Sequence, residues 1–255
     1  SWKRKRKCRR STEYNHILYM KEGIPKMDTK QEVSFSEFEE RVFPGLPEVM
    51  EKNLRSKFDT GERMDEFIAE RIEEDLPGAI QSEREFSRQV FEVCARWANE
   101  RDSIVLWDVD ETMGKYLFGP DGKPRWGFRP VLLPLFEFLQ EKFPGLRHGI
   151  LSSRGDIQDQ LNDPEHLQRI SRFIDPEHVY SSRGKYVPSQ VENAYHEKGQ
   201  EQGIYNITPE KAEILRELRE SGKNVKDIDD DGVAALAEKD GLCVYAVWPN
   251  EYFCG

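Results

Sequence analysis

The chain has 255 residues, of which 37% are apolar and 34% are charged, and its net charge at neutral pH is −10. That length and composition suffice for one sizeable hydrophobic core, or for one domain with a helical appendage. No run approaches the length of a membrane span, and the four scattered cysteines form no CxxC pair of the kind that indicates a zinc site.

Residues 1–30 form a basic N-terminal tail. They carry ten lysines and arginines against three acidic residues, so they bring +7 to the net charge and the remaining chain brings −17. Most of this excess lies in KRKRKCRR (3–10), a run typical of a nucleic-acid contact or of a signal for an import receptor, although a solvated tail is an equal alternative. With no apolar leader segment, the sequence favours a cytoplasmic protein, or a nuclear one if the run is an import signal.

Residues 31–101 are predicted to be a helical region. Two sets of large apolar residues recur there at helical intervals, and the pair Ser82 and Glu85 predicts that the second helix starts at Ser82. The sets are Met64, Phe67, Ile68 and Ile72, and Phe86, Val90, Cys94 and Trp97. These residues cannot all cover one another in so short a segment, so we expect the helices to dock on the rest of the chain.

Residues 102–255 are predicted to form an α/β domain with a doubly wound, mainly parallel sheet, because short apolar runs alternate there with amphipathic helices. The expected strands are 104–107, 148–151, 178–181, 225–228 and 242–247, and the expected helices are 131–143, 156–172, 209–221 and 232–240. In such sheets the functional crevice lies beyond the carboxyl ends of the strands.

The first expected strand runs into two aspartates in the stretch IVLWDVDETMG (104–114). Burying like charges is costly, and an unpaired carboxylate in an apolar setting tends to take up a proton instead. Asp108 and Asp110 therefore predict that positive charge converges on this point.

Later elements deliver complementary groups to the same edge. Ser152, Ser153 and Arg154 end the second strand, Lys211 opens the helix before the fourth strand, and Asp229 and Asp230 end that fourth strand. Because the carboxyl ends of parallel strands meet at one edge of a sheet, we expect these side chains to lie close together. Lys185 remains an alternative to Lys211.

The order of these groups resembles the four motifs of the haloacid dehalogenase superfamily of phosphatases. The first motif, DxDxT after an apolar strand, stands here as DVDET (108–112), and the second, a serine ending the next strand, stands as GILSS (149–153). The third, a lysine opening a helix, is best matched by Lys211, and the fourth, an acidic pair ending a strand, by DIDDD (227–231). The resemblance covers roughly residues 103–250.

The resemblance implies a Mg²⁺-dependent phosphatase that acts through an aspartyl-phosphate. Asp108 would be the nucleophile, Asp110 would protonate the leaving alcohol and activate the hydrolytic water, and Ser152 and Lys211 would contact the phosphoryl group. The metal ligands would be the Asp108 carboxylate, the backbone carbonyl of Asp110, and Asp229 or Asp230. Thr112, Ser153 and Arg154 would complete the substrate-binding site.

The substrate expectation depends on what covers the site. The stretch LFGPDGKPRWGF (117–128) predicts a short hairpin flap in place of a full cap, and an open site favours a macromolecular substrate such as a phosphoprotein or a nucleic-acid end. Arg125, Arg129 and Arg154 could form a basic rim. A small-molecule phosphatase, a phosphotransferase and a non-catalytic partner-binding module remain alternatives.

Overall fold

The computed structural model describes residues 29–58, 62–118, 124–164, 166–201, 208–230, 242–243 and 253–254. Three expectations fall wholly or partly outside these residues. They are the basic run 3–10, the helix at 232–240 and most of the strand at 242–247.

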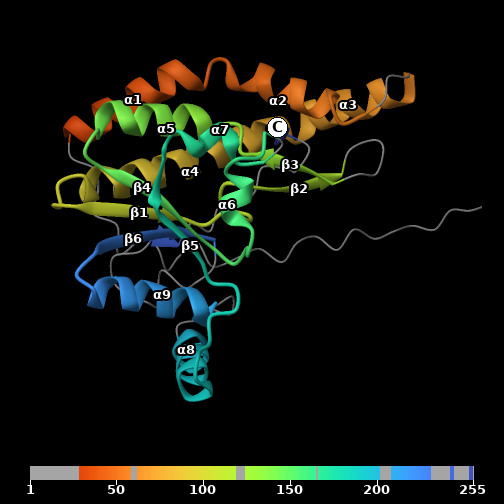
Figure 1. Ribbon diagram of the computed structural model, residues 1–255. Helices are drawn as coiled ribbons and strands as arrows, with labels where there is room; N and C mark the ends of the chain where they lie inside the picture. Colours follow the sequence, from red (N-terminus) through yellow and green to blue (C-terminus); the bar gives the residue numbers. More distant parts are fainter. Residues whose placement is uncertain are drawn as a thin grey trace, which may run out of the picture.

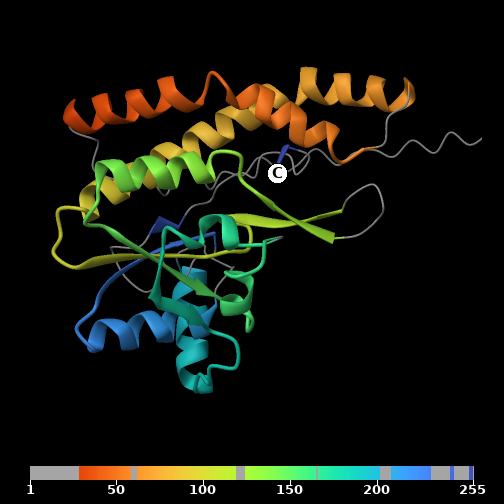
Figure 2. The same ribbon diagram turned by 45° about the horizontal axis from the view of Figure 1, so that its top comes forward.

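Four helices precede the sheet and confirm the helical character of this region. They are α1 (Thr29–Val42), α2 (Leu46–Arg55), α3 (Glu62–Glu74) and α4 (Leu76–Trp97), and Figures 1 and 2 show α1 to α3 running along one side of the molecule above α4. The predicted start at Ser82 is wrong, because α4 already begins at Leu76. Pro77 lies in its first turn, where proline favours helix initiation and lacks only an N–H that the helix does not use.

A parallel sheet forms the centre of the fold, as the sequence predicts. Its strands are β1 (Ser103–Trp107), β4 (Arg147–Ser152), β5 (Ile174–Ser181), β6 (Asn224–Asp229) and β7 (Leu242–Cys243). They lie in the order β5-β4-β1-β6-β7, and each neighbouring pair is parallel. The strand order reverses at β1, so a crevice is expected beyond the carboxyl ends of β1 and β6.

The predicted flap is present as an antiparallel pair that projects from the carboxyl edge. It consists of β2 (Gly114–Phe118) and β3 (Pro124–Phe128), and the residues of its turn lie outside the described part of the chain. Gly114 is required where the flap begins. A Cβ atom there would lie 2.5 Å from the backbone oxygen of Gly127 and 2.7 Å from the Trp126 ring.

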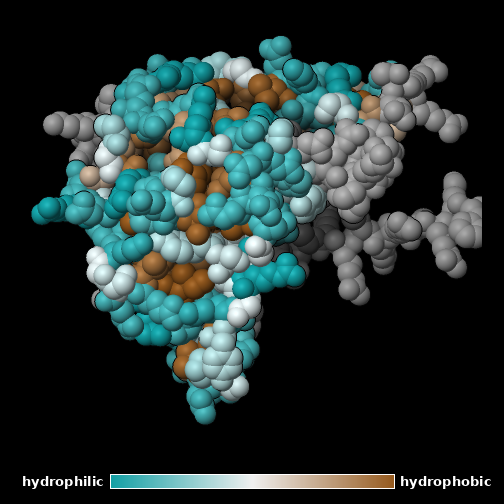
Figure 3. Space-filling view, viewed as in Figure 1, coloured by the Kyte–Doolittle hydropathy of each residue, from teal (hydrophilic) through white to brown (hydrophobic). Residues whose placement is uncertain are grey.

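Helices cover both faces of the sheet (Figure 1). On one face, α5 (Leu132–Lys142) lies with α4, and on the other lie α8 (Ser189–Glu201) and α9 (Pro209–Glu220). The outer sides of these layers are mainly hydrophilic, with hydrophobic residues visible between the elements (Figure 3).

Two helix predictions need correction. The single helix expected at 156–172 is two short pieces, α6 (Ile157–Gln160) and α7 (Gln168–Ser171), separated around Asp163 and Pro164. A residue before proline is driven away from helical geometry, so the helix ends there. Helix α8 is not among the helices expected from the sequence, because Gly199 is its one buried residue and the segment gives no amphipathic signal.

The helical region shares a hydrophobic core with one face of the sheet. Phe38 of α1 packs on Phe138 of α5 with ring centroids 5.2 Å apart, and the same cluster contains Trp107 of β1. The expected docking of these helices is therefore observed. Residues 253–254 also return to this region, where Asn53 of α2 donates a 3.0 Å hydrogen bond to the carbonyl oxygen of the buried Phe253.

The opposite face holds a smaller cluster beneath α9. Its buried members are Ile104, Leu106, Leu151, Ala212, Leu215 and Val225. In the parts of the chain that the structure describes, no helix is long and apolar enough to cross a lipid bilayer.

Candidate functional site

A lysine and two aspartates meet at the carboxyl edge of the sheet, beyond β1 and β6. Asp108 follows β1, Asp229 ends β6, and Lys211 lies in the first turn of α9. The Lys211 Nζ donates to Asp108 Oδ1 at 2.7 Å and to Asp229 Oδ2 at 2.6 Å, and all three side chains are at most 5% exposed. The structure thus brings Asp108 together with Lys211, 103 residues further along the chain, and with Asp229, which follows Lys211 by 18 residues.

The electrostatics of Asp108 indicate a shortage of positive charge. Burial raises its pKa to about 7, the charge and hydrogen bond of Lys211 oppose that rise, and the nearby charge of Asp230 adds to it. One lysine therefore does not fully compensate the carboxylates around it.

The carboxylates fit a divalent metal ion. Asp108, Asp229 and Asp230 each place one carboxylate oxygen within 4.8 Å of the others. Hard oxygen ligands of this kind suit Mg²⁺ or Ca²⁺, and with Lys211 the group carries a formal charge of −2 that a divalent ion would neutralise. The sequence left open whether Asp229 or Asp230 would bind the metal. Both lie in this group, so the geometry allows both to be ligands.

Asp110 lies beside this group but binds a different partner. Its two carboxylate oxygens accept hydrogen bonds from Arg154, through Nε at 2.6 Å and through Nη2. The Arg154 guanidinium also lies over the rings of Tyr116 and Trp126, at 4.8 and 4.7 Å from their centroids, and donates to the Tyr116 hydroxyl at 3.1 Å. The flap is thereby connected to Asp110. A metal contact from its backbone carbonyl stays a prediction.

The serines occupy the neighbouring strand ends. Ser152 is fully buried at the end of β4, and its Oγ accepts a hydrogen bond from the backbone N–H of Arg154 at 3.2 Å. Ser153 is exposed and accepts a hydrogen bond from the hydroxyl of Ser182, which follows β5. Both therefore lie at the carboxyl edge, as predicted.

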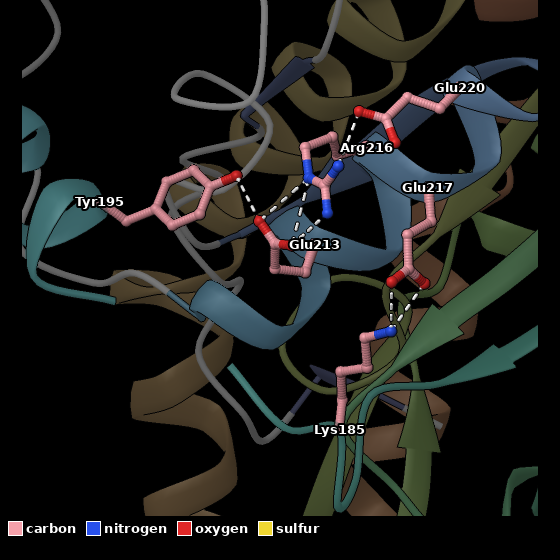
Figure 4. A network of polar contacts seen from close by, with 6 residues as sticks. All are labelled: Lys185, Tyr195, Glu213, Arg216, Glu217 and Glu220. Atoms are coloured by element: carbon pink, nitrogen blue, oxygen red, sulfur yellow. Dashed lines mark hydrogen bonds and ion pairs between the residues drawn. The ribbon is translucent and has the colours of Figure 1, made fainter. Parts of the chain in front are cut away.

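Thr112 lies at the site, whereas Lys185, the alternative to Lys211, does not. Thr112 is buried, and its Oγ1 lies 3.5 Å from Asp230 Oδ1. Lys185 instead binds the carboxylate of Glu217 on the outer side of α9, at 2.6 and 2.7 Å (Figure 4). Of the two candidate lysines, Lys211 is the one in contact with Asp108.

Sequence reasoning missed Glu83 and misplaced Arg129. Both side chains are completely buried, and they form an ion pair of 2.7 Å behind the flap, so Arg129 is not part of a basic rim. A usable signal was present, because Glu83 interrupts the apolar stripe of α4 formed by Leu76, Ala79, Phe86 and Val90. A charged residue on such a stripe calls for a buried partner.

The chain matches no model of a protein family, no curated protein and no solved structure. The assignment of the site therefore depends on the residues themselves. What carries it is their convergence at the point where the strand order reverses.

Proposed function

We propose that the chain is a Mg²⁺-dependent phosphomonoesterase of the haloacid dehalogenase type, with Asp108 as the nucleophile. One observation carries the proposal. The Asp108 carboxylate is buried against Lys211. Together with Asp229 and Asp230 it supplies three carboxylate oxygens that lie close enough to one another to bind one metal ion. Burying carboxylates beside a single lysine carries a desolvation cost, which a bound divalent ion would offset.

In the proposed reaction, an Asp108 oxygen attacks phosphorus, the bond from phosphorus to the leaving oxygen breaks, and that oxygen takes a proton from Asp110. Asp110 then takes a proton from water, which hydrolyses the aspartyl-phosphate and releases phosphate. Lys211 offsets the charge on the phosphoryl oxygens. Mg²⁺ held by Asp108, Asp229 and Asp230 would supply the positive charge that lets a carboxylate approach an anionic phosphate.

The contact between Arg154 and Asp110 adds a condition to this reaction. Asp110 must be able to reach the leaving oxygen, but both of its carboxylate oxygens are engaged by the Arg154 guanidinium. A substrate phosphate offers Arg154 equivalent oxygens close by. Arg154 would therefore exchange Asp110 for the phosphoryl group when substrate binds, which releases Asp110 for proton transfer.

We retain a macromolecular substrate, such as a phosphoprotein or a nucleic-acid end, as the favoured class. Between Asp108 and β4 the described residues form the flap and α5, and neither is a domain-sized cover. Among the described residues of this segment, the flap is the element beside the site, which suits a bulky phosphorylated partner.

The first test is hydrolysis of an aryl phosphate with Mg²⁺, with EDTA, and with EDTA followed by excess Mg²⁺. The key variant is Asp108→Asn, which keeps the size of the side chain but removes the attacking carboxylate. We expect its kcat to fall at least about 10³-fold, while the variant remains folded. Wild-type turnover in this variant would disprove the nucleophile assignment.

Asp102→Asn is the matched control, because Asp102 precedes β1 at the opposite edge of the sheet and is exposed. Its backbone has a φ of 56°, a conformation that asparagine adopts readily, so this control should keep full activity. A screen of phosphopeptides, phosphorylated oligonucleotides, nucleotides and sugar phosphates then tests the substrate class.

A further inference from the structure

A buried ion pair links the helical region to the loop that carries the proposed catalytic aspartates. Glu83 lies on α4, Arg129 follows β3, and their side chains have no exposed surface. Arg129 Nη1 lies 2.7 Å from Glu83 Oε1, and the other oxygen of Glu83 accepts from the backbone N–H of Val131 at 3.4 Å.

Arg129 also holds the loop that carries Asp108 and Asp110, through its Nε and its backbone N–H. Its Nε donates a 2.9 Å hydrogen bond to the backbone carbonyl of Thr112. The backbone N–H of Arg129 donates a second hydrogen bond, of 3.0 Å, to the backbone carbonyl of Met113. The guanidinium also lies over the Phe86 ring of α4, 4.2 Å from the centroid. The fixed carbonyl therefore belongs to the residue two positions after Asp110.

The loop needs such support because its backbone is strained. Glu111 has a φ of 63°, which is uncommon for a residue with a side chain. Strained backbone persists where the surroundings over-determine it, and the carbonyl that Arg129 holds is on the next residue. Without that hydrogen bond, the segment from Asp108 to Thr112 could relax away from its present geometry.

A contribution to folding stability does not by itself explain the ion pair of Glu83 and Arg129. Replacing a buried ion pair by well-packed apolar residues is often neutral or stabilising, and Glu83 lies on a stripe that is otherwise apolar. What an apolar pair cannot do is hold a backbone carbonyl in a fixed direction. The arrangement therefore serves the geometry of the loop.

We propose that Glu83 is a positioning residue for the proposed reaction. It orients Arg129, which fixes the carbonyl of Thr112 and, through it, the relation of Asp108 to Asp110. The helical region is thereby part of the catalytic unit. This inference rests on the proposed phosphatase function.

The test is Glu83→Gln in the full chain, which keeps the side-chain size and removes the charge that orients Arg129. We expect kcat for an aryl phosphate to fall about 10- to 100-fold with little change in KM, because small misplacement of reacting groups lowers turnover more than binding. Arg129→Lys should give a similar loss, since one ammonium cannot reproduce the planar fork.

Glu37→Gln is the matched control. Glu37 of α1 binds Lys142 of α5 at 2.6 Å, so it also joins the helical region to the core, but its contact ends away from the loop. This variant should keep the wild-type kcat. Phe38→Leu supplies a second control, because it weakens the same interface without touching Arg129.

Hydrogen exchange of residues 108–114 gives a readout that does not need activity. Glu83→Gln and Arg129→Lys should exchange faster there than Glu37→Gln and Phe38→Leu. If both variants are folded and keep wild-type kcat and exchange, or if Phe38→Leu loses kcat equally, the positioning role is wrong. A wild type that hydrolyses no phosphate ester, yet shows this exchange pattern, would overturn the proposed function and leave the loop support standing.

Discussion

The two faces of the sheet are held by different forces. The face covered by α4 and α5 is packed with aromatic side chains, such as Phe91 and Phe138 at 5.9 Å between ring centroids. The face covered by α9 has a small aliphatic cluster, and the outer side of α9 carries ion pairs such as Arg216 with Glu213 and Glu220 (Figure 4). The first face is held mainly by apolar burial, which provides most of a fold's stability.

The two faces make different contributions to the candidate site. The aromatic face supplies the rigid support, through Glu83 and Arg129, while the lightly packed face supplies the lysine that contacts Asp108. Damage to the aromatic packing of the first face should therefore cost mainly stability, whereas damage at Lys211, or at the pair Glu83 and Arg129, should cost mainly activity.

Between the two faces, the largest expected effect is at Lys211. Lys211→Met should lower kcat for an aryl phosphate about 10²- to 10³-fold, because a preorganised charge at the phosphoryl oxygens is lost. Lys185→Met is the control, since Lys185 lies between β5 and α8 and binds Glu217 on the outer side of α9, not Asp108. Equal loss in both variants, measured under identical Mg²⁺, would remove Lys211 from the proposed mechanism.

A smaller effect separates the faces by stability. Leu135 of α5 and Leu215 of α9 are both fully buried, one in each cluster, and urea unfolding can compare the same substitution in each. We expect Leu135→Ala to lower the free energy of unfolding by about 4–5 kcal/mol and Leu215→Ala by about 2–3 kcal/mol, because a cavity collapses more easily under the lightly packed helix. A larger loss at Leu215 would reverse the comparison.

The smallest expected effect is a dependence of stability on pH, again on the aromatic face. His148 of β4 is buried beside Phe136, accepts a 3.1 Å hydrogen bond from Trp107 Nε1, and burial lowers its pKa to about 4. The unfolded chain takes up this proton near pH 6.5 and the folded chain does not. The stability that the neutral ring contributes is therefore complete above pH 6.5 and lost as pH falls toward 4, by roughly 3 kcal/mol at most.

His148→Gln provides the comparison for this pH term, because glutamine can still accept from the indole but does not titrate. Urea unfolding at several pH values between 7 and 4 should show a shallower loss in the variant than in the wild type. Parallel curves would mean that His148 takes up a proton as easily in the fold as outside it.

The sequence predicted the structure best where an apolar run marks a strand and the rules for parallel sheets then place the residues at its end. Apolar runs such as 104–107 and 225–228 predicted strands that the structure extends by only one residue at most ends, and the rule for parallel sheets placed Asp108 near Asp229. That rule depends on topology and not on side-chain detail, so it survives small errors in element boundaries.

Features fixed by distant contacts were not predictable in the same way. Helix α8 has almost no buried side chain, so its sequence carries no amphipathic period. The proposed role of Glu83 depends on its contact with Arg129, 46 residues away. The hydrogen bonds between Arg154 and Asp110 depend on how the flap packs on the Arg154 side chain. No local pattern reports such pairs, although a lone charge on an apolar stripe marks where to look.

The return of residues 253–254 to α2 has a consequence for the order of folding. Asn53 meets Phe253 across 200 residues of sequence, so this contact can form only after the residues between them have been synthesised. At a ribosomal rate of about 5–20 residues per second, α2 emerges roughly 10–40 s before its partner. During that interval the part of α2 that contacts Phe253 stays uncovered. Chaperone binding to nascent chains should therefore concentrate on this region until residues 253–254 have docked.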